Sequence, residues 1–440
     1  MLGVCCMRRS FPQCCLPLPG TLPPCLWLIL KVVLLIAMEP VVVGEQTTSL
    51  PPYPHHEDVA KLAASQNNFT RDLYLKLAKT NSGNIFISPF SIMTALGMTH
   101  SGTAGNTEKE VQSVMHLSQD KEAIHNAFQD IITDLKDEST DYELRTSNMA
   151  YVSDKMTVLS DFSNTLREKY LSSSNTVNFA DSERVRKEIN TAVEKETNSR
   201  IKDLIPSGML NDLTKMVLVN AVYFKGLWEH QFEESDTYDQ EFWLSESKST
   251  NVPMMHITKQ FRIQHNKDLG AMLLAMDYKG SRISMVFVLP DKRDGLVEVE
   301  AKLATTDLNN IDKKLQRVKV EVCIPKFKLE ESLDLVDHLK EMGMRDLFDI
   351  KSCNLSGITG SNDLFVSNVV HKAFLEVNEQ GCEAAAATGM VIMKRSLPMP
   401  PPRFIADHPF LFFIRDQQTG LILFSGRFVL PEHMPSKDEL

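Results

Sequence analysis

The segment from Glu379 to Pro402 constrains the fold more than any other, because its residues suit two different conformations. Every second position over 382–392 is uncharged, and the first four of these residues are small. A strand with this pattern can bury one face between other strands without a clash. Gly381 and Gly389 bracket an alanine run that is too short for a stable helix, and the prolines within 398–402 keep the chain extended. We therefore expect an exposed loop that can also join a β-sheet as a strand.

Hydrophobic periodicity along the chain is helical in the first half and strand-like in the second. Phe69, Leu73 and Leu77 recur every four residues and predict a helix from about residue 62. A second helix is predicted around 185–193, with Ser182 as its cap. Strands are expected over 216–223, 283–289, 318–324, 410–414 and 421–424, and the last two flank a turn. Helices and strands do not alternate regularly, which indicates the α+β class.

The domain organisation follows from the ends of the chain. No linker rich in Gly, Ser or Pro interrupts the middle, so a single domain is expected over 58–433, preceded by a loose, proline-containing lead-in segment over 45–57. Residues 1–44 place a basic pair before a short apolar stretch, which is typical of a secretory signal peptide. Lys31 interrupts the run of ~20 apolar residues that a retained membrane anchor needs. A third possibility is that translation starts at Met38, in which case the protein has no leader.

The C-terminal tail, 434–440, ends in a retrieval signal for the endoplasmic reticulum: Lys437, Asp438, Glu439 and Leu440. This signal acts only at a free C-terminus inside the lumen, which agrees with a leader at the other end of the chain. The two ends together predict residence in the endoplasmic reticulum lumen and early secretory pathway, with part of the protein secreted where retrieval is incomplete. The KDEL receptor is the expected partner, and no stable membrane span is expected.

Charge and cysteine usage exclude several classes of protein. The formal net charge of −10 argues against a nucleic-acid binder, which usually carries a basic excess. Five of the eight cysteines lie in the leader, and the remaining Cys323, Cys353 and Cys382 are too scattered for a disulfide framework or a metal site. Asn68 and Asn354 begin Asn-x-Ser/Thr sequons and are candidate glycosylation sites in a lumenal protein.

No motif for catalysis is present in the sequence. The chain has no Gly-x-Ser-x-Gly elbow, no His-Glu-x-x-His pair and no phosphate-binding Gly-rich loop. The run His55-His56-Glu57-Asp58 has no matching ligand pair and is interpreted as a solvated stretch, so no metal and no cofactor are expected. A hydrolase with an unrecognised catalytic triad has no support, and we expect a protein that is not an enzyme.

From about residue 58 to 433 the sequence resembles the serpin family of serine protease inhibitors. The blocks that carry the resemblance are 84–91, 219–228, 370–374 and 404–410, the last followed by the predicted C-terminal hairpin. The resemblance implies three β-sheets with surrounding helices and an exposed reactive loop over 379–402. It also implies that a target protease cleaves this loop, which then inserts as a new strand into the largest sheet while the acylated protease is trapped.

The resemblance further assigns roles to individual residues. The hinge that leads into the inserted strand comprises Glu379, Gly381, Cys382, Glu383, Ala384, Ala385, Ala386, Ala387 and Thr388. The main sheet opens at Ser88, Ser91, Asn220 and His371, and the loop first enters beside Trp228, Lys326 and Glu379. Cys382 departs from the small hydroxyl or aliphatic residues usual in the family, but it is compact and uncharged, so insertion is expected to survive.

The bait residue follows from a count along the loop. In the family the scissile bond usually lies sixteen residues beyond the hinge glutamate, which places it between Arg395 and Ser396. An arginine bait implies a protease with an acidic specificity pocket, as in trypsin-like enzymes. The pair Lys394-Arg395 resembles the cleavage sites of subtilisin-like proprotein convertases, with which a covalent complex is expected. Ile392 replaces the basic residue that furin-like members favour, so convertases satisfied by a dibasic pair are preferred.

Two alternative functions stay open at this point. The protein could inhibit trypsin-like proteases after secretion, or act as a non-inhibitory serpin of the endoplasmic reticulum that binds client proteins as a chaperone. The intact small-residue hinge argues against the chaperone, because a binding protein does not need to insert its loop. We expect the protein to be a monomer in either case.

Overall fold

Two hydrogen-bonded sheets organise the part of the chain that the computed structural model describes, residues 53–136, 141–380 and 400–431. The smaller sheet has the strand order β10-β11-β4-β2-β3. Its strands are β10 (Phe327–Asp334), β11 (Asn368–Val377), β4 (Met216–Gly226), β2 (Tyr142–Ser153) and β3 (Ser173–Val177). The two middle strands, β11 and β4, are parallel to one another. β10 pairs antiparallel with β11, and β2 pairs antiparallel with β4.

The larger sheet is a nine-stranded network built around one long strand, β6 (Lys248–Asn266). The other strands are β1 (Ile85–Ile87), β5 (Thr237–Ser245), β7 (Ala271–Asp277), β8 (Ile283–Pro290), β9 (Gln316–Pro325), β12 (Arg403–Ile405), β13 (Phe410–Asp416) and β14 (Ile422–Phe428). β6 pairs with β5 and β9 along most of its length and with β7 near its end. The three sheets implied by the resemblance are therefore present, but two of them share β6 and form one network.

This continuity corrects one expectation about the loop. The predicted loop begins directly after β11, at the end of the five-stranded sheet, and not in the sheet with the most strands. The nine-stranded network has more strands only because β6 belongs to two sheets and joins them. A strand added beside β11 would therefore join the five-stranded sheet, where β11 is at present paired with β10 on one side and with β4 on the other.

The predicted strands are confirmed, with one difference in burial. Every residue of β4 except Lys225 is buried, as expected for a strand covered on both faces. The C-terminal hairpin forms from β13 and β14, which pair antiparallel. In β9 the side chains of Val320, Val322 and Ile324 are fully buried, but Val318 is 37% exposed. The predicted apolar face therefore begins two residues later than the alternation of the sequence suggests.

Helices occupy the first half of the chain and the connections between later strands. They are α2 (His56–Thr80), α3 (Pro89–His100), α4 (Gly105–Val114), α5 (Lys121–Lys136), α6 (Ser160–Lys169), α7 (Ser182–Glu196), α8 (Leu296–Leu303), α9 (Val336–Met342) and α10 (Ser356–Thr359). α2 buries Phe69, Leu73 and Leu77, which confirms the helical period predicted there. Short 3₁₀ turns cover 179–181, 234–236, 308–310 and 346–348.

Two helix starts differ from the sequence-based expectation. α2 begins at His56, so the loose segment predicted over 45–57 is too long by His56 and Glu57. The backbone N–H of His55 also donates to Asp130, which ties the chain to α5 before the helix begins. In α7 the residue before the helix is Asp181, and Ser182 is already helical rather than the cap. Acidic residues in the first turn of each helix favour these starts through the helix dipole.

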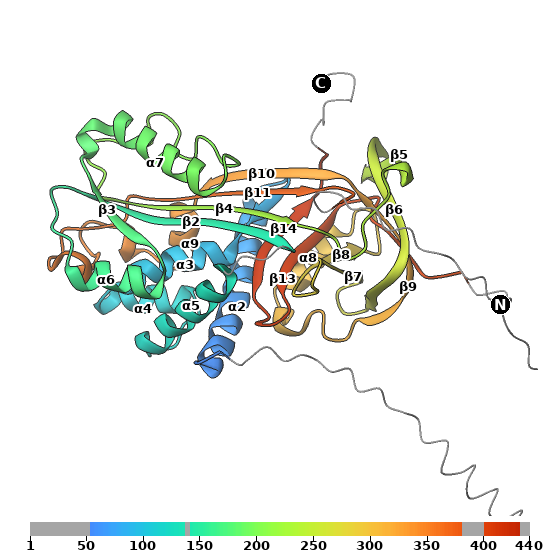
Figure 1. Ribbon diagram of the computed structural model, residues 1–440, viewed down its shortest axis with the longest axis horizontal. Helices are drawn as coiled ribbons and strands as arrows, with labels where there is room; N and C mark the ends of the chain where they lie inside the picture. Colours follow the sequence, from blue (N-terminus) through green and yellow to red (C-terminus); the bar gives the residue numbers. More distant parts are fainter. Residues whose placement is uncertain (1–52, 137–140, 381–399, 432–440) are drawn as a thin grey trace, which may run out of the picture. The chain divides into compact units, whose positions relative to one another are not determined.

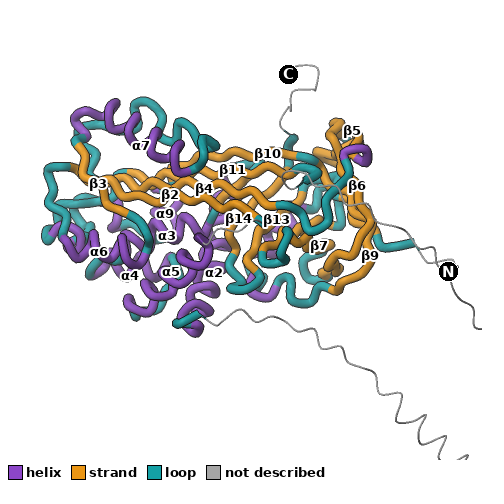
Figure 2. Tube along the Cα trace, viewed as in Figure 1, coloured by secondary structure: helices purple, strands orange, loops and turns teal. Residues whose placement is uncertain are grey.

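The helices cover both faces of the five-stranded sheet, as Figures 1 and 2 show. α7 lies over one face, where Val185, Ile189 and Val193 join an apolar cluster with residues of β4 and β11. α3 lies on the opposite face and contacts β2, β4 and β14. The parallel pair of β11 and β4 is therefore enclosed between helices.

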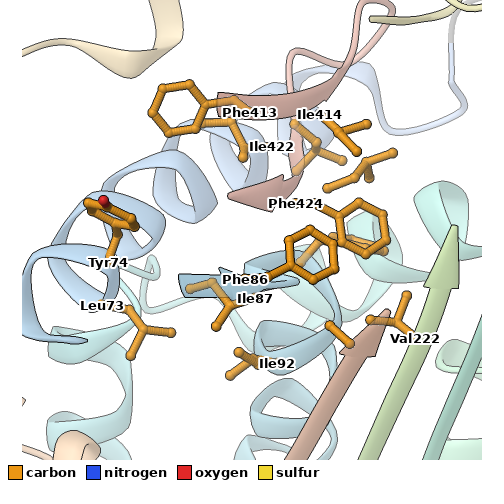
Figure 3. Packing of buried hydrophobic residues seen from close by; sticks show 14 of the residues in the cluster. Leu73, Tyr74, Phe86, Ile87, Ile92, Val222, Phe413, Ile414, Ile422 and Phe424 are labelled. Atoms are coloured by element: carbon orange, nitrogen blue, oxygen red, sulfur yellow. The ribbon is translucent and has the colours of Figure 1, made fainter. Parts of the chain in front are cut away.

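Aromatic side chains pack between the two sheets, where β1 and β14 meet β4. The rings of Phe86 in β1 and Phe424 in β14 are stacked with centroids 5.4 Å apart, and Phe224 of β4 lies 5.6 Å from Phe424. Figure 3 shows Phe86 and Phe424 facing one another beside Val222 and Ile92. Such ring pairs contribute about 0.5–1.5 kcal/mol beyond the area they bury.

The core is held without disulfides among the described residues. Cys323 and Cys353 are free and buried, and burial raises the pKa of each thiol to about 12. In the same part of the chain no group of three or more His, Cys, Asp and Glu side chains could hold a metal ion. None of the described helices is long and apolar enough to cross a membrane.

Candidate functional site

The base of the predicted loop is anchored at the end of β11. Glu379 is only 6% exposed, and its Oε2 accepts a hydrogen bond from Nζ of Lys326 at 3.0 Å. Burial alone would raise the pKa of this carboxyl, but hydrogen bonds from the backbone and from Lys326 outweigh it and lower the pKa of Glu379 below its ordinary value. Lys326 stands between β9 and β10, so this ion pair ties the start of the loop to both sheets.

Trp228 fixes the backbone around Glu379. Its indole Nε1 donates to the carbonyl of Asn378 at 3.0 Å, and its backbone N–H donates to the carbonyl of Gln380 at 3.3 Å. The carbonyl of Glu379 accepts from the backbone N–H of Phe232 at 2.9 Å. Three successive carbonyls are thus held, and the Trp228 ring is itself stacked on Tyr278 with centroids 4.3 Å apart. The structure therefore brings Trp228, Lys326 and Glu379 together, as predicted.

The other end of the loop is attached to a different sheet. β12 pairs in parallel with β9, and the carbonyl of Pro402 accepts from the backbone N–H of Glu321 at 3.0 Å. Arg403 adds an ion pair with Glu321 at 3.1 Å. The two ends of the loop are consequently held by β11 in one sheet and by β9 in the other.

Most of the predicted loop residues lie outside the described residues. These are Gly381, Cys382, Glu383, Ala384, Ala385, Ala386, Ala387, Thr388, Ile392, Lys394, Arg395 and Ser396. The leader over 1–44 and the retrieval signal Lys437–Leu440 also lie outside them. Their assignments stay predictions.

A buried polar cluster lies at the centre of the five-stranded sheet and consists of Ser88, Ser91, Asn148, Asn220 and His371. Asn148, Asn220 and His371 form a row across three adjacent strands, because Asn220 of β4 is paired in register with Asn148 of β2 and with His371 of β11. The Asn220 amide donates to Ser91 Oγ and to Asn148 Oδ1. The structure therefore joins the four predicted sheet-opening residues and adds Asn148.

The serines of this polar cluster come from the start of α3. Ser88 is the N-cap residue, whose Oγ accepts from the backbone N–H of Ser91 at 3.3 Å, and Pro89 occupies the first helical position. The Ser88 hydroxyl also donates to the carbonyl of Leu423 in β14 at 2.7 Å. One helix cap thus connects α3 to the C-terminal hairpin and to the sheet.

The contacts of His371 determine its protonation state. The backbone N–H of Ser88 donates to Nε2 at 3.1 Å, so the proton of the neutral ring is on Nδ1, which donates to Asn220 Oδ1. The ring is fully buried, and burial lowers the pKa of His371 from 6.5 to about 3. The neutral ring therefore holds β11 against β4 and against the cap of α3.

Comparison with known proteins agrees with this arrangement. Residues 64–431 match the sequence profile of the serpin (serine protease inhibitor) family. The chain is 40% identical over 379 residues to the leukocyte elastase inhibitor of Homo sapiens, covering 84% of this chain and 100% of that protein. The chain belongs to the serpin family.

Further relatives support the assignment in sequence and in structure. This serpin is 38% identical over 392 residues to Serpin B3 of Homo sapiens, with 84% of this chain and 99% of that protein covered. Serpin48, described as a highly specific serpin of the insect Tenebrio molitor, superposes with a TM-score of 0.77 at 34% identity, covering 84% of this chain and 98% of that one. The α+β serpin fold is thereby confirmed, in a family of serine protease inhibitors rather than of enzymes.

The two candidate glycosylation sites lie at half-buried positions of this serpin. Asn68 is within α2, between the buried Asn67 and Phe69. Asn354 precedes α10, where its Oδ1 accepts from the backbone N–H of Ser356 and its own backbone N–H donates to Thr107. Both assignments stay predictions.

The buried neutral His371 makes the stability of this serpin depend on pH. Because its pKa falls from 6.5 to about 3 on folding, the unfolded chain binds more protons than the native state between these values. The free energy of unfolding is therefore expected to decrease as the pH is lowered from 7 towards 4. Burial lowers the pKa of His100 and His125 in the same sense, so His371 accounts for part of the decrease.

The substitution His371→Gln isolates the part that His371 contributes. The variant should be less stable than wild type at pH 7.5, and its denaturant midpoint should fall less steeply with acidification, because glutamine does not titrate. His56→Gln, at an exposed position at the start of α2, is the matched control and should follow the wild type. Equal pH dependence of the midpoint in wild type and His371→Gln would show that the ring does not behave as described.

Proposed function

We propose that this serpin inhibits serine proteases that cleave after arginine, with Arg395–Ser396 as the bond attacked. The observation that carries this proposal is the anchored position of Glu379, which is held by Lys326, Trp228 and Phe232 at the end of β11. Because this residue marks where the loop leaves the sheet, the family spacing of sixteen residues reaches Arg395. Along the sequence, the small-residue hinge then lies between Glu379 and the bait.

The same geometry supports trapping by strand insertion. β11 and β4 run in parallel through eight register pairs, from Asn368 with Val217 to Leu375 with Phe224. A strand that turns back after Glu379 would run antiparallel to both, so insertion replaces one parallel ladder by two antiparallel ladders, which are slightly more stable per residue. Roughly ten new strand residues at ~1 kcal/mol per hydrogen bond would release on the order of 10 kcal/mol.

The proposed targets are subtilisin-like proprotein convertases. The name of the human leukocyte elastase inhibitor states that it acts on elastase. The specificity pocket of elastase is small, however, and does not suit an arginine bait, whereas an acidic pocket does. The pair Lys394-Arg395 further favours proteases that recognise two basic residues, and Ile392 favours those that do not require a third.

The proposed compartment is the endoplasmic reticulum lumen and early secretory pathway. Residues 1–63 and 432–440 lie outside the part of the chain that matches the family, so the leader and the retrieval signal are additions to the serpin domain. The KDEL receptor would return the protein to the reticulum, and incomplete retrieval would release part of it from the cell. Convertases act along this route, where inhibitor and target would meet.

A second candidate is inhibition of trypsin-like proteases after secretion, which the same Arg395 supports. A non-inhibitory chaperone of the reticulum is a third. The fold alone does not choose among them, since the human thyroxine-binding globulin, solved with its ligand, also superposes with a TM-score of 0.77 at 30% identity. The small, uncharged residues at alternate hinge positions favour an inhibitor.

The bait assignment predicts the effect of Arg395→Ala. Purified wild-type protein mixed with a dibasic-specific convertase should form an SDS-stable complex and be cut after Arg395. The substitution should slow complex formation by roughly a hundredfold or more, because the acidic pocket loses its partner. Lys187→Ala, on the exposed face of α7, is the control and should behave as wild type. Unchanged complex formation by Arg395→Ala would refute the bait, and faster trapping of a trypsin-like protease would favour the second candidate.

The insertion mechanism predicts opposite results for two neighbouring hinge variants. Ala384→Arg places a charge on the face of the strand that becomes buried, so the variant should be cleaved as a substrate without forming a complex. Ala385→Arg places the same charge on the other face and should keep inhibiting, because side chains alternate along a strand. The ratio of complex to cleaved inhibitor on SDS gels measures the difference. Inhibition retained by Ala384→Arg would rule out insertion in this register.

The retrieval signal predicts where the protein accumulates in cells. Deletion of Lys437 to Leu440 should move most of the protein from the endoplasmic reticulum to the culture medium, measured by immunoblot of cells and medium. Replacement of Pro435 and Ser436 by alanine leaves the last four residues intact and should not change the distribution. Equal secretion of the full chain and the deletion would mean that the signal is not read.

A further inference from the structure

Tyr238 differs from the other tyrosines of this serpin in its exposure. All eight tyrosines lie within the described ranges, and seven of them are buried or half-buried. Tyr238 alone is exposed, at 52%. The hydroxyls of Tyr74 and Tyr170, by contrast, form hydrogen bonds in the core with Glu300 and His125. Tyr238 is therefore the tyrosine whose phenol another protein can reach.

The ring of Tyr238 is held on one side by β6. It stacks on the imidazole of His256, with the ring centroids 4.5 Å apart and the two planes 2° from parallel. A stack of this kind covers one face of the ring, which agrees with an exposure of about half. The substitution Tyr238→Phe would keep this contact and remove only the hydroxyl.

The strand that carries Tyr238 is an edge strand. Among the described strands β5 pairs with β6 alone, and Figure 1 shows it at the outer side of β6. An unpaired strand edge presents backbone N–H and C=O groups with which an extended segment of another protein can pair. An enzyme could thus bind the backbone beside the exposed phenol.

Carboxylates flank Tyr238 on both sides in the sequence. Five of them lie within five residues of it, and all five are exposed: Glu233, Glu234, Asp236, Asp239 and Glu241. No lysine or arginine occurs between residues 226 and 247. Burial lowers the pKa of His256, whereas the charges of Glu321 and Asp236 act in the opposite sense, so Asp236 also lies near the stack in space. The segment around the phenol therefore carries an excess of negative charge.

We propose that Tyr238 is a site of O-sulfation. In this reaction the phenolic oxygen of Tyr238 attacks the sulfur of a phosphosulfate donor, 3′-phosphoadenosine 5′-phosphosulfate. A bond forms between the tyrosine oxygen and the sulfur, and the bond between the sulfur and the bridging phosphate oxygen breaks. Adenosine 3′,5′-bisphosphate leaves with the electron pair of that bond, and the phenolic proton passes to a base of the transferase.

The charge around Tyr238 suits the enzyme that such a donor requires. A donor with phosphate and sulfate groups is bound in a basic cleft, and carboxylates on both sides of the acceptor tyrosine are attracted to the same cleft. Lysine or arginine beside the tyrosine would be repelled by it. A kinase that uses ATP has a similar requirement, so phosphoryl transfer is the alternative that the test has to separate.

The choice of sulfate rests on the proposed function, because sulfuryl transfer to tyrosine takes place in the Golgi lumen. Molecules that the KDEL receptor returns early would carry little sulfate, and molecules that pass beyond retrieval would carry more. Sulfate on Tyr238 would then distinguish the secreted part of the protein from the retained part.

The site is tested first on the purified, folded full chain with a tyrosylprotein sulfotransferase and ³⁵S-labelled donor. Tyr238→Phe should reduce incorporation at least about tenfold, and thermal midpoints should show that every variant is folded. Glu234→Gln combined with Asp239→Asn should slow incorporation several-fold, because the attraction to the basic cleft weakens. The matched control, Glu122→Gln with Asp212→Asn at exposed positions away from β5, should behave as wild type. Equal incorporation by wild type and Tyr238→Phe, or none into the wild type, would overturn the site.

A second test uses cells that are given ³⁵S-labelled sulfate, with the label recovered from the protein as tyrosine sulfate. Deletion of Lys437 to Leu440 should raise the labelled fraction, and Tyr238→Phe in the same deletion should abolish the label. A deletion variant that is secreted without label would overturn the site. Equal labelling with and without the signal would support the site and refute the proposed retrieval. Label from ³²P-phosphate that a phosphatase removes, in place of sulfate, would overturn sulfation in favour of phosphoryl transfer.

Discussion

The parallel pairing of β4 with β11 is the contact on which the rest of the structure depends. Both strands are buried between α7 and α3, and their outer neighbours are antiparallel. A parallel ladder is the less stable kind per residue, so the seam between β4 and β11 is weaker per residue than the antiparallel ladders on either side of it. The polar cluster spans this seam with hydrogen bonds, and it ties α3 and β14 to the same place. Packing that stabilises the native state thereby also keeps the seam closed.

The loop base adds a second constraint at the end of the same seam. Trp228, Phe232 and Lys326 hold residues 378 to 380 by their backbone and by one buried carboxylate. A strand that begins to insert must start at this end, because Glu379 is joined directly to β11. An inserting strand would therefore meet the contacts of Glu379 first, at the end of the pair of β4 and β11, and the polar cluster second, at the centre of this pair. In the proposed mechanism, cleavage removes the constraint from the far end of the loop while both of these contacts still have to open.

The sequence was sufficient for most elements but not for relations between distant strands. The continuous apolar run of β4, the hairpin of β13 and β14, and the four-residue spacing of apolar residues in α2 are local patterns, so they could be predicted. Asn148 could not, because its role depends on the register that places it opposite Asn220. The joining of two sheets by β6 could not be predicted either, because it depends on which strands pair with β6. Val318 was predicted on a buried face, but it lies near the start of β9, where that face is not yet covered.

The position of the C-terminal strands has a consequence for the cleaved protein. A cut after Arg395 would divide the chain into two polypeptides, and the shorter one contains β12, β13 and β14. β13 and β14 are buried throughout and pair with β8 and β1, so the shorter polypeptide would remain part of the core without a covalent link. The acylated protease would be attached to Arg395 on the longer polypeptide, whereas the retrieval signal is on the shorter one. Only the packing of the hairpin of β13 and β14 would then keep the trapped protease in one particle with the retrieval signal, so this packing would determine whether the complex returns to the endoplasmic reticulum.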